Sequence, residues 1–126
     1  MIYLYVMIGG AFGASLRYLI SSKVNQILVS KLLFPWGTFA VNIIGSLIIG
    51  ILMGLFEFKE VSPEIRLMFI TGFLGALTTF SSFSYETFSL FRDGDIKLAL
   101  LNIILNNLFC ILFTFIGYRI ILLIKG

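Results

Sequence analysis

The sequence is poor in the residues that build metal centres and soluble surfaces. It contains no histidine, one cysteine and two prolines among 126 residues, and only 12% of its residues are charged. A chain with so few nitrogen and sulfur ligands cannot assemble an ordinary zinc or iron site, and one cysteine cannot form an internal disulfide. The net charge of +3 comes from scattered basic residues, which do not form the patch that nucleic-acid binding needs.

What the chain has in abundance is hydrophobic side chains. They make up 60% of the sequence, whereas soluble domains have about 45–50% apolar and about 25% charged residues. The composition therefore indicates an integral membrane protein with a single domain over residues 1–126. The apolar N-terminus lacks a basic start and a small-residue cleavage site, so we expect it to be a first helix and not a cleaved signal peptide.

Four stretches are long and apolar enough to be spanning helices, which need about 20 residues each. We predict spans at 1–22, 32–56, 67–85 with an extension to about 91, and 98–118 with an extension to 124. The predicted connections are 23–31, 57–66 and 92–97. The fold class is thus an all-α membrane protein of four transmembrane helices with both termini on one side.

Lysine and arginine are almost evenly divided between the two sides. The first side would carry Lys59, Arg66, Arg119 and Lys125, and the second would carry Arg17, Lys23, Lys31, Arg92 and Lys97. Orientation in the membrane follows an excess of these residues on one side. The balance favours a chain that inserts in both orientations and pairs with its inverted copy as an antiparallel homodimer. The alternative is a small but decisive bias, with Arg17 in a cavity.

The stretch GFLGALTTFSSFSYETF at 72–88 places helix-weakening residues inside the third span. Gly72, Gly75 and the pair Thr78 and Thr79 weaken an α-helix, because glycine is flexible and hydroxyl groups compete for backbone hydrogen bonds. We therefore predict a break in this helix. Free carbonyls at membrane depth are tolerated inside protein or beside a polar cavity, where they suit a hard cation. Two copies crossing at a two-fold axis would provide a symmetric set of oxygens.

Phe80 and Phe83 follow the break and share a helix face. The edge of a phenyl ring is positive, so edges that point into a pore could stabilise a small anion without binding it too tightly to leave. The chain has 14 phenylalanines, however, and most must pack or face lipid. From spacing alone, packing remains the simpler interpretation of either ring.

The second span has two polar residues on one face, Thr38 and Asn42, which are four residues apart. Asn42 needs hydrogen-bond partners in lipid, and both a helix–helix bond and a pore-lining role are open to it. A stripe of small residues follows. For this stripe, Gly45, Ser46, Gly50 and Gly54, we favour close helix packing.

The fourth span repeats polar residues every four positions, and its other residues are mostly apolar. The repeat consists of Asn102, Asn106, Cys110, Thr114 and Tyr118, with Asn107 beside it. This spacing predicts a polar track along one helix face, which favours a lining role over a purely structural one. Glu86 is the one carboxylate within a predicted span. Amides, hydroxyls and aromatic edges suit the passive passage of an anion better than proton-coupled export of a cation.

Three motifs together resemble one known family. GGAFGASLRY (9–18), PWGTFAVNIIGSLIIG (35–50) and GFLGALTTFSSFSYETF (72–88) are similar to the Fluc, or CrcB-type, fluoride channel family. The resemblance extends over the whole chain in length, in its four-span layout and in the order of the motifs. The combination of the second and third motifs is long and unusual in composition, which makes it specific.

The resemblance implies a dual-topology antiparallel homodimer in the bacterial plasma membrane, with two fluoride pores and a central structural sodium ion (Na+). It implies passive export of cytoplasmic fluoride, which protects the cell. The match of motifs also implies a role for individual residues. Gly75 and Thr78 would offer carbonyls to sodium, and Phe80 and Phe83 would be the pore aromatics, with Asn42 as the pore amide. Ser81 and Ser82 would line the approach and Arg17 would attract anions at the entrance, while Thr38 and Glu86 match without a definite role.

The sequence departs from the family pattern in two places. Ala76 stands where a second glycine is common, although alanine is small enough for the break to survive. The fourth span is rich in asparagine where many relatives have hydroxyls or an aromatic, and Asn102 falls where some have a tyrosine. The detailed geometry of the polar track is therefore this chain's own.

Two other classes of protein share the size of this chain. A small dual-topology multidrug exporter would have four spans and balanced charge, but it should carry a glutamate in the first span, and this span has none. A membrane scaffold without transport would not need the polar track or the broken third span. An enzyme is the least favoured class, because Glu86 has no basic or nucleophilic partner in the sequence pattern.

Overall fold

The computed structural model describes residues 1–28 and 34–125, and all regular structure in these residues is helical. The three uninterrupted long helices are α1 (Ile2–Leu28), α2 (Trp36–Phe58) and α6 (Ile96–Lys125). These three and the segmented stretch Pro63–Arg92 are each long and apolar enough to cross a membrane. The predicted all-α membrane fold with four spans is confirmed.

The third span consists of four consecutive helical pieces. They are α3 (Pro63–Arg66), the π-helix η1 (Leu67–Leu74), α4 (Gly75–Leu77) and α5 (Phe80–Arg92). The first three continue directly into one another. Two residues separate α4 from α5, and the predicted break in the third span is therefore present.

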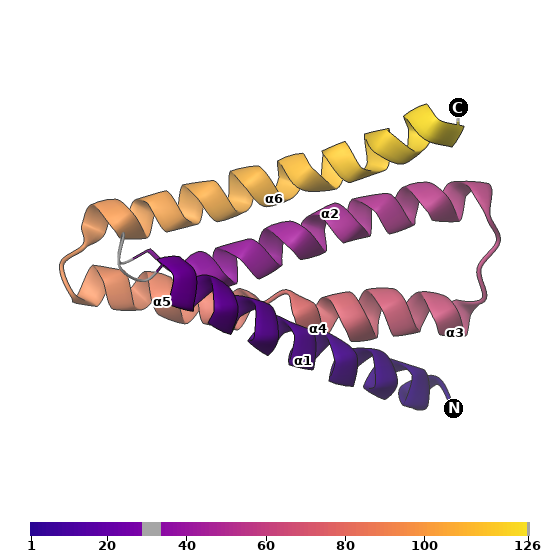
Figure 1. Ribbon diagram of the computed structural model, residues 1–126, viewed down its shortest axis with the longest axis horizontal. Helices are drawn as coiled ribbons and strands as arrows, with labels where there is room; N and C mark the ends of the chain where they lie inside the picture. The colour runs from indigo at the N-terminus through magenta and orange to yellow at the C-terminus, as the bar shows by residue number, and fades with distance from the viewer. Residues whose placement is uncertain (29–33, 126) are drawn as a thin grey trace.

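The helices lie side by side along the long axis of the molecule (Figure 1). α2 packs most extensively against α6, whereas α1 packs against η1 and α4. α5 contacts α6 more than any other helix. The two termini lie at the same end of the molecule, in agreement with the predicted topology (Figure 1).

The connections are shorter than the sequence predicted. α1 continues to Leu28, six residues beyond the predicted end of the first span at residue 22. α3 begins at Pro63, where proline fits the first helical turn and the Ser62 side chain accepts a hydrogen bond from the Ile65 amide. Residues 93–95 alone connect α5 to α6, with Gly94 at a positive φ of 86°. The predicted start of the second span at residue 32, together with Lys31, lies outside the described residues.

Glycines allow the helices to approach closely. A methyl group at Gly50 would collide with the Thr114 carbonyl on α6, and one at Gly13 would collide with the Phe73 carbonyl on η1. Backbone atoms cannot move aside as the end of a side chain can. The predicted packing role of the small-residue stripe on α2 is therefore confirmed at Gly50, and at Gly54, whose missing side chain leaves room for Ile121.

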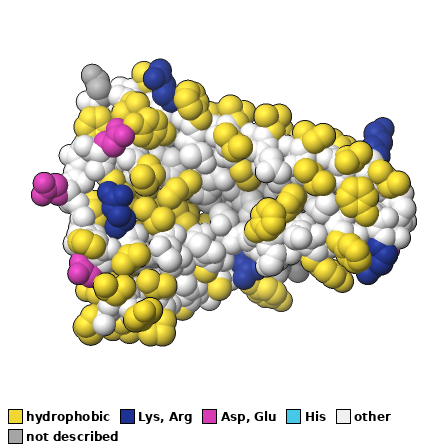
Figure 2. Space-filling model, turned by 180° about the vertical axis from the view of Figure 1, so that it is seen from behind, with side chains coloured by type: hydrophobic (Ala, Val, Ile, Leu, Met, Phe, Trp, Pro, Cys, Tyr) yellow, Lys and Arg dark blue, Asp and Glu magenta, His cyan; other side chains and the backbone are white. Residues whose placement is uncertain are grey.

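The surface is that of a membrane protein. Large hydrophobic side chains on every long helix are exposed in the isolated chain. Figure 2 shows hydrophobic side chains spread along one face, with acidic side chains at one end of this view. An apolar surface over all the long helices suits a bilayer, whose hydrocarbon core is about 30 Å thick.

Candidate ion site at the break in the third span

The break lies at the two threonines. Thr78 (φ −87°, ψ 160°) and Thr79 (φ −150°, ψ 122°) are extended, while Gly72 and Gly75 remain helical. The predicted break therefore falls at two of the four named residues, and Gly72 lies in the π-helix that precedes it. Threonine hydroxyls explain the position: Thr79 Oγ1 caps α5 by accepting from the Ser82 amide at 3.1 Å, and Thr78 Oγ1 donates to the Leu74 carbonyl at 3.0 Å.

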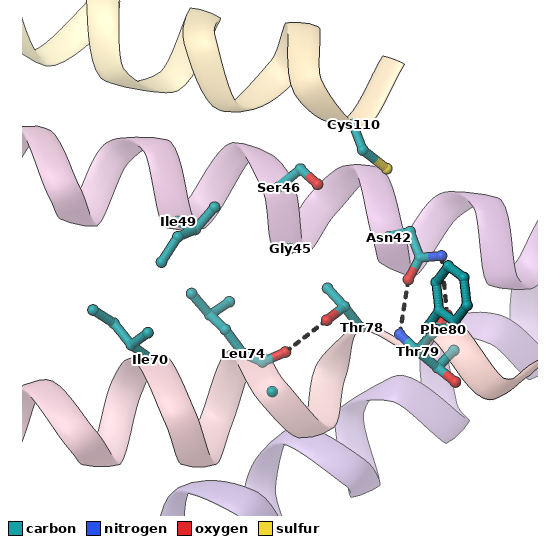
Figure 3. Close-up of a pocket in the computed structure, with 11 residues that line it drawn as sticks. Asn42, Gly45, Ser46, Ile49, Ile70, Leu74, Thr78, Thr79, Phe80 and Cys110 are labelled. Atoms are coloured by element: carbon teal, nitrogen blue, oxygen red, sulfur yellow. Dashed lines mark hydrogen bonds between the residues drawn. The ribbon is translucent and has the colours of Figure 1, made fainter. Parts of the chain in front are cut away.

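Asn42 of α2 holds the extended backbone of Thr79 from the side. Its Oδ1 accepts a hydrogen bond from the Thr79 amide at 2.9 Å, and its Nδ2 donates to the Thr79 carbonyl at 3.2 Å (Figure 3). The Thr79 amide is thereby directed to Asn42, whereas in a continuous helix it would donate to the Gly75 carbonyl four residues earlier. Asn42 thus stabilises the break by substituting for lost helical hydrogen bonds.

Arg17 contacts the same break from α1. Its Nε donates to the Ala76 carbonyl at 2.9 Å, and its side chain is half-buried. A cation next to the C-terminal end of a helical segment also interacts favourably with the helix dipole. Arg17 therefore lies within a spanning helix and against the break, whereas the charge count from the sequence had placed it on one side of the membrane. The predicted attraction of anions by Arg17 stays a prediction.

A hollow of about 390 Å³ opens beside the break (Figure 3). It is bounded by residues of α2, η1, α4, the break, α5 and α6. Four of the predicted site residues line it, namely Asn42, Gly75, Thr78 and Phe80. Gly75 is exposed and Thr78 half-buried, so the backbone at the break is accessible from the surface of the isolated chain.

The two predicted pore aromatics contact each other at the start of α5. The ring centroids of Phe80 and Phe83 are 5.3 Å apart, and the ring planes are inclined by 54°. Phe80 is 76% exposed, whereas Phe83 is 7% exposed. Between them, Ser81 Oγ lies 3.3 Å from Thr79 Oγ1, and the Ser82 amide makes the capping bond. The pair thus has one buried ring and one ring that faces outward.

Two asparagines of α6, Asn102 and Asn106, lie behind Asn42 and are buried. Asn42 Nδ2 donates to Asn106 Oδ1 at 3.2 Å, and Asn106 Nδ2 donates to Asn102 Oδ1 at 2.8 Å. Asn102 Nδ2 donates to Thr87 Oγ1 at 2.8 Å, and Thr87 Oγ1 donates to the Phe83 carbonyl at 2.8 Å. Asn102 and Asn106 are 0% and 5% exposed. The polar track exists at these positions, and its pore-lining role stays a prediction.

Thr87 is a member of this cluster that the sequence analysis missed. It is buried on α5, four residues after Phe83 and therefore on the same helix face. That spacing was a usable signal, because a threonine one turn after a pore aromatic can bond the carbonyl before it.

The remainder of the polar track serves contacts between α6 and α2. Thr114 Oγ1 lies 3.1 Å from the Ser46 carbonyl and 3.0 Å from the Cys110 carbonyl. The Tyr118 hydroxyl donates to Glu57 Oε1 at 2.6 Å. Thr38 is buried on α2, one turn before Asn42. A pore role for Thr38 and Thr114 stays a prediction.

Glu86 lies on α5, seven residues after Thr79 of the break. It borders a second hollow of about 300 Å³ together with Ser89, Asp93 and Asp95. Glu86 Oε1 and Ser89 Oγ are buried and have no hydrogen-bond partner among the described residues. The structure does not bring Glu86 to the hollow beside the break.

The chain matches known sequences over nearly its full length. The family model described as CrcB-like protein, Camphor Resistance (CrcB), matches residues 4–118. A protein of Methanococcus aeolicus named fluoride-specific ion channel FluC is 48% identical over 90% of this chain and 89% of its own length. Proteins with the same name from Shewanella woodyi and Geotalea daltonii are 47% and 46% identical, covering 94% and 90% of this chain and 94% and 91% of their own lengths.

The chain therefore belongs to the CrcB-like family. The resemblance drawn from the three sequence motifs is confirmed. The relatives carry the name of ion channels and not of enzymes, and the four apolar spans make this chain a multi-pass membrane protein.

Proposed function

We propose that this chain is a fluoride-selective channel through which cytoplasmic fluoride leaves the cell passively, protecting it from fluoride. The observation that carries the proposal is the break at Thr78 and Thr79, clamped by Asn42 and followed at once by the Phe80–Phe83 pair. Hydroxyl donors and positive ring edges can replace part of the water around a small anion without binding it as a full charge would. The names of the relatives agree with this function.

The channel acts as an antiparallel homodimer in the bacterial plasma membrane, with two pores. Exposed Gly75 and the open hollow beside it leave polar backbone at membrane depth, which needs a protein partner in lipid. Arg17 is bonded inside the span and belongs to neither side. Removing it from the sequence count leaves four basic residues on each side, which gives no orientation preference and favours insertion both ways.

A sodium ion at the dimer interface would be held by the Gly75 and Thr78 carbonyls of both copies. The residues fit this ion, because the Thr79 amide bonds Asn42 and leaves the Gly75 carbonyl available, and because oxygen is the ligand that hard cations prefer. Bound sodium would supply positive charge that links the two breaks.

Fluoride passes along the face that the aromatic pair presents. Phe80 and Phe83 offer ring edges, and Ser81 and Ser82 lie on the approach. Asn42 lines the pore beside the break, with its amide hydrogens already bonded to Thr79 and Asn106. Arg17 raises the local anion concentration. Four further polar residues, Thr38, Asn102, Asn106 and Thr114, belong to the same polar track on α2 and α6.

Efflux from liposomes tests the function. Purified protein is reconstituted into liposomes loaded with potassium fluoride or potassium chloride, and ion release is followed with ion-selective electrodes after valinomycin is added. We expect fast fluoride release, little chloride release and no need for a proton gradient. A folded dimer that releases neither ion would disprove the channel, and release that depends on a proton gradient would instead support an exporter.

A further inference from the structure

Five hydrogen bonds join the two ends of the first turn of α5 by a path through α2 and α6. The path begins at the Thr79 amide, which donates to Asn42, and continues through Asn106, Asn102 and Thr87 to the Phe83 carbonyl. Its members lie far apart in the sequence but close in space. Residues 79 and 83, at which the path begins and ends, enclose the turn that carries the aromatic pair.

All five bonds run in the same sense, since each member donates to the next. Hydrogen bonds arranged in this way polarise one another, so the chain is stronger than its separate links. This arrangement also fixes the orientation of each amide, because turning one asparagine over would place donor against donor at one neighbour and acceptor against acceptor at the other.

The central amides have no donor to spare for an ion. Asn42 Nδ2 uses its two hydrogens on the Thr79 carbonyl and on Asn106 Oδ1. Asn106 Nδ2 uses its two on the carbonyl and the Oδ1 of Asn102, at 3.1 Å and 2.8 Å. Both Asn102 and Asn106 are shielded from the surface. An anion could reach them only by breaking bonds that hold the break and the aromatic turn.

We propose that Asn106 is a positioning residue that fixes the turn carrying Phe80 and Phe83. It acts on one end of this turn through Asn42 and on the other end through Asn102 and Thr87. The effect on conduction rests on the proposed function. The effect on the turn does not. Loss of Asn106 would leave Asn102 Oδ1 buried without its partner and Asn42 Nδ2 with the Thr79 carbonyl as its one acceptor, which loosens both ends of the turn together.

The decisive comparison is between two neighbouring asparagines. Asn106→Leu removes the central amide and keeps a similar volume. Asn107→Leu is the matched control, because Asn107 is exposed and its Nδ2 bonds only the Ile103 carbonyl of its own helix. Hydrogen–deuterium exchange of the peptide covering 79–88 reports the turn. Efflux at less than one channel per liposome separates the fraction of liposomes that empty, which counts folded channels, from the rate at which each empties.

We expect Asn106→Leu to speed exchange of this peptide about tenfold and to slow fluoride release per channel about tenfold, with Asn107→Leu unchanged in both. If Asn106→Leu does not fold, Thr87→Val cuts the last link alone, and the same two changes are expected at a smaller size. Slower release with unchanged exchange would mean that Asn106 contacts the ion directly, and would overturn the proposal. Faster exchange with unchanged release per channel, or no change in either, would also overturn it.

Hydrogen–deuterium exchange and fluoride efflux test this proposal and the proposed channel function separately. Wild-type protein that releases no fluoride would disprove the channel. The exchange comparison of Asn106→Leu with Asn107→Leu would still test whether the amide chain holds the turn.

Discussion

The two halves of the third span are held in place by different physical means. The first half packs against α1 with close backbone contacts. Gly9 and Gly13 of α1 lie against the backbone of Met68 and Phe73, and Gly72 lies against the backbone of α1. The second half, α5, is tied to α2 and α6 by side-chain hydrogen bonds.

These two kinds of contact suit the different roles of the two halves in the proposed channel. Close backbone packing leaves no space for adjustment, and it gives the residues before the break a fixed platform. Hydrogen bonds between side chains set direction as well as distance, which is what an aromatic pair beside a pore needs. The break lies between the two halves, where Arg17 reaches it from α1 and Asn42 from α2.

The largest effect is expected from breaking the close packing of the first half. Gly13→Val places a branched side chain against the Phe73 carbonyl, which cannot move aside without shifting η1. We expect a loss of at least about 3 kcal/mol or failure to fold, seen as loss of the monodisperse peak in size-exclusion chromatography. Ala14→Val is the control, because Ala14 is exposed on the same helix. Equal behaviour of the two variants would refute close packing as the support of this half.

The aromatic pair of the second half gives the next largest effect. Phe80→Ile and Phe83→Ile remove the ring edges, and we expect fluoride efflux to fall at least about tenfold while the protein still assembles. Phe88→Ile, on an exposed part of the same helix, should conduct normally. Wild-type efflux in both pair variants would exclude an aromatic role in the pore. Because Phe83 is buried and Phe80 is exposed, we expect only Phe83→Ile to lower thermal stability noticeably.

A substitution of Arg17 tests how the break between the two halves is held. Arg17→Met removes the charged donor to the Ala76 carbonyl and keeps the aliphatic stem, with an expected loss of about 1.5–3 kcal/mol in thermal or denaturant unfolding. Arg119→Met is the control, since Arg119 is exposed near the end of α6. A variant as stable as the wild type would mean that the Arg17–Ala76 bond contributes nothing to the break.

The smallest effect is expected from the cap of α5. Thr79→Val removes the hydroxyl that accepts from the Ser82 amide, which should cost about 1 kcal/mol, and Thr79→Ser should restore most of it. The cap of α3 offers the matched comparison. Ser62→Ala removes an exposed cap in the first half, so its loss should be smaller. Equal losses in the two halves would contradict the view that hydrogen bonds matter more for the second half.

Much of this arrangement was predictable from the sequence. Hydrophobic runs separated by charges predict the four spans, and consecutive threonines after two glycines predict a break in the third. The exact break, however, depends on which hydrogen bonds compete successfully with the helix. Gly75 stays helical, and Thr79 leaves the helix where Asn42 accepts its amide. Asn42 lies 37 residues away in the sequence, so no local pattern could indicate this pairing.

Two misjudged residues show the same limit. Arg17 was counted with the basic residues on one side of the membrane, but the Ala76 carbonyl at the break accepts a hydrogen bond from it inside the helix bundle. Thr87 lies in a stretch with many hydroxyls, and the sequence analysis did not distinguish it from the others. Its importance comes from the hydrogen bond that it accepts from Asn102 of α6. A buried polar residue is explained by its partners, and partners on other helices are set by how the helices pack.

Composition, hydrophobic runs and local backbone preference indicate the membrane class, the number of spans and the weak point in the third span, and the resemblance of the three motifs indicates the family. The packing of the helices sets three contacts that no local pattern indicates: Asn42 with Thr79, Arg17 with Ala76, and the directed chain from Asn106 and Asn102 to Phe83. The reason is that hydrogen bonds need donors and acceptors within about 3 Å, and only the packing of α1, α2, α5 and α6 brings them to that distance.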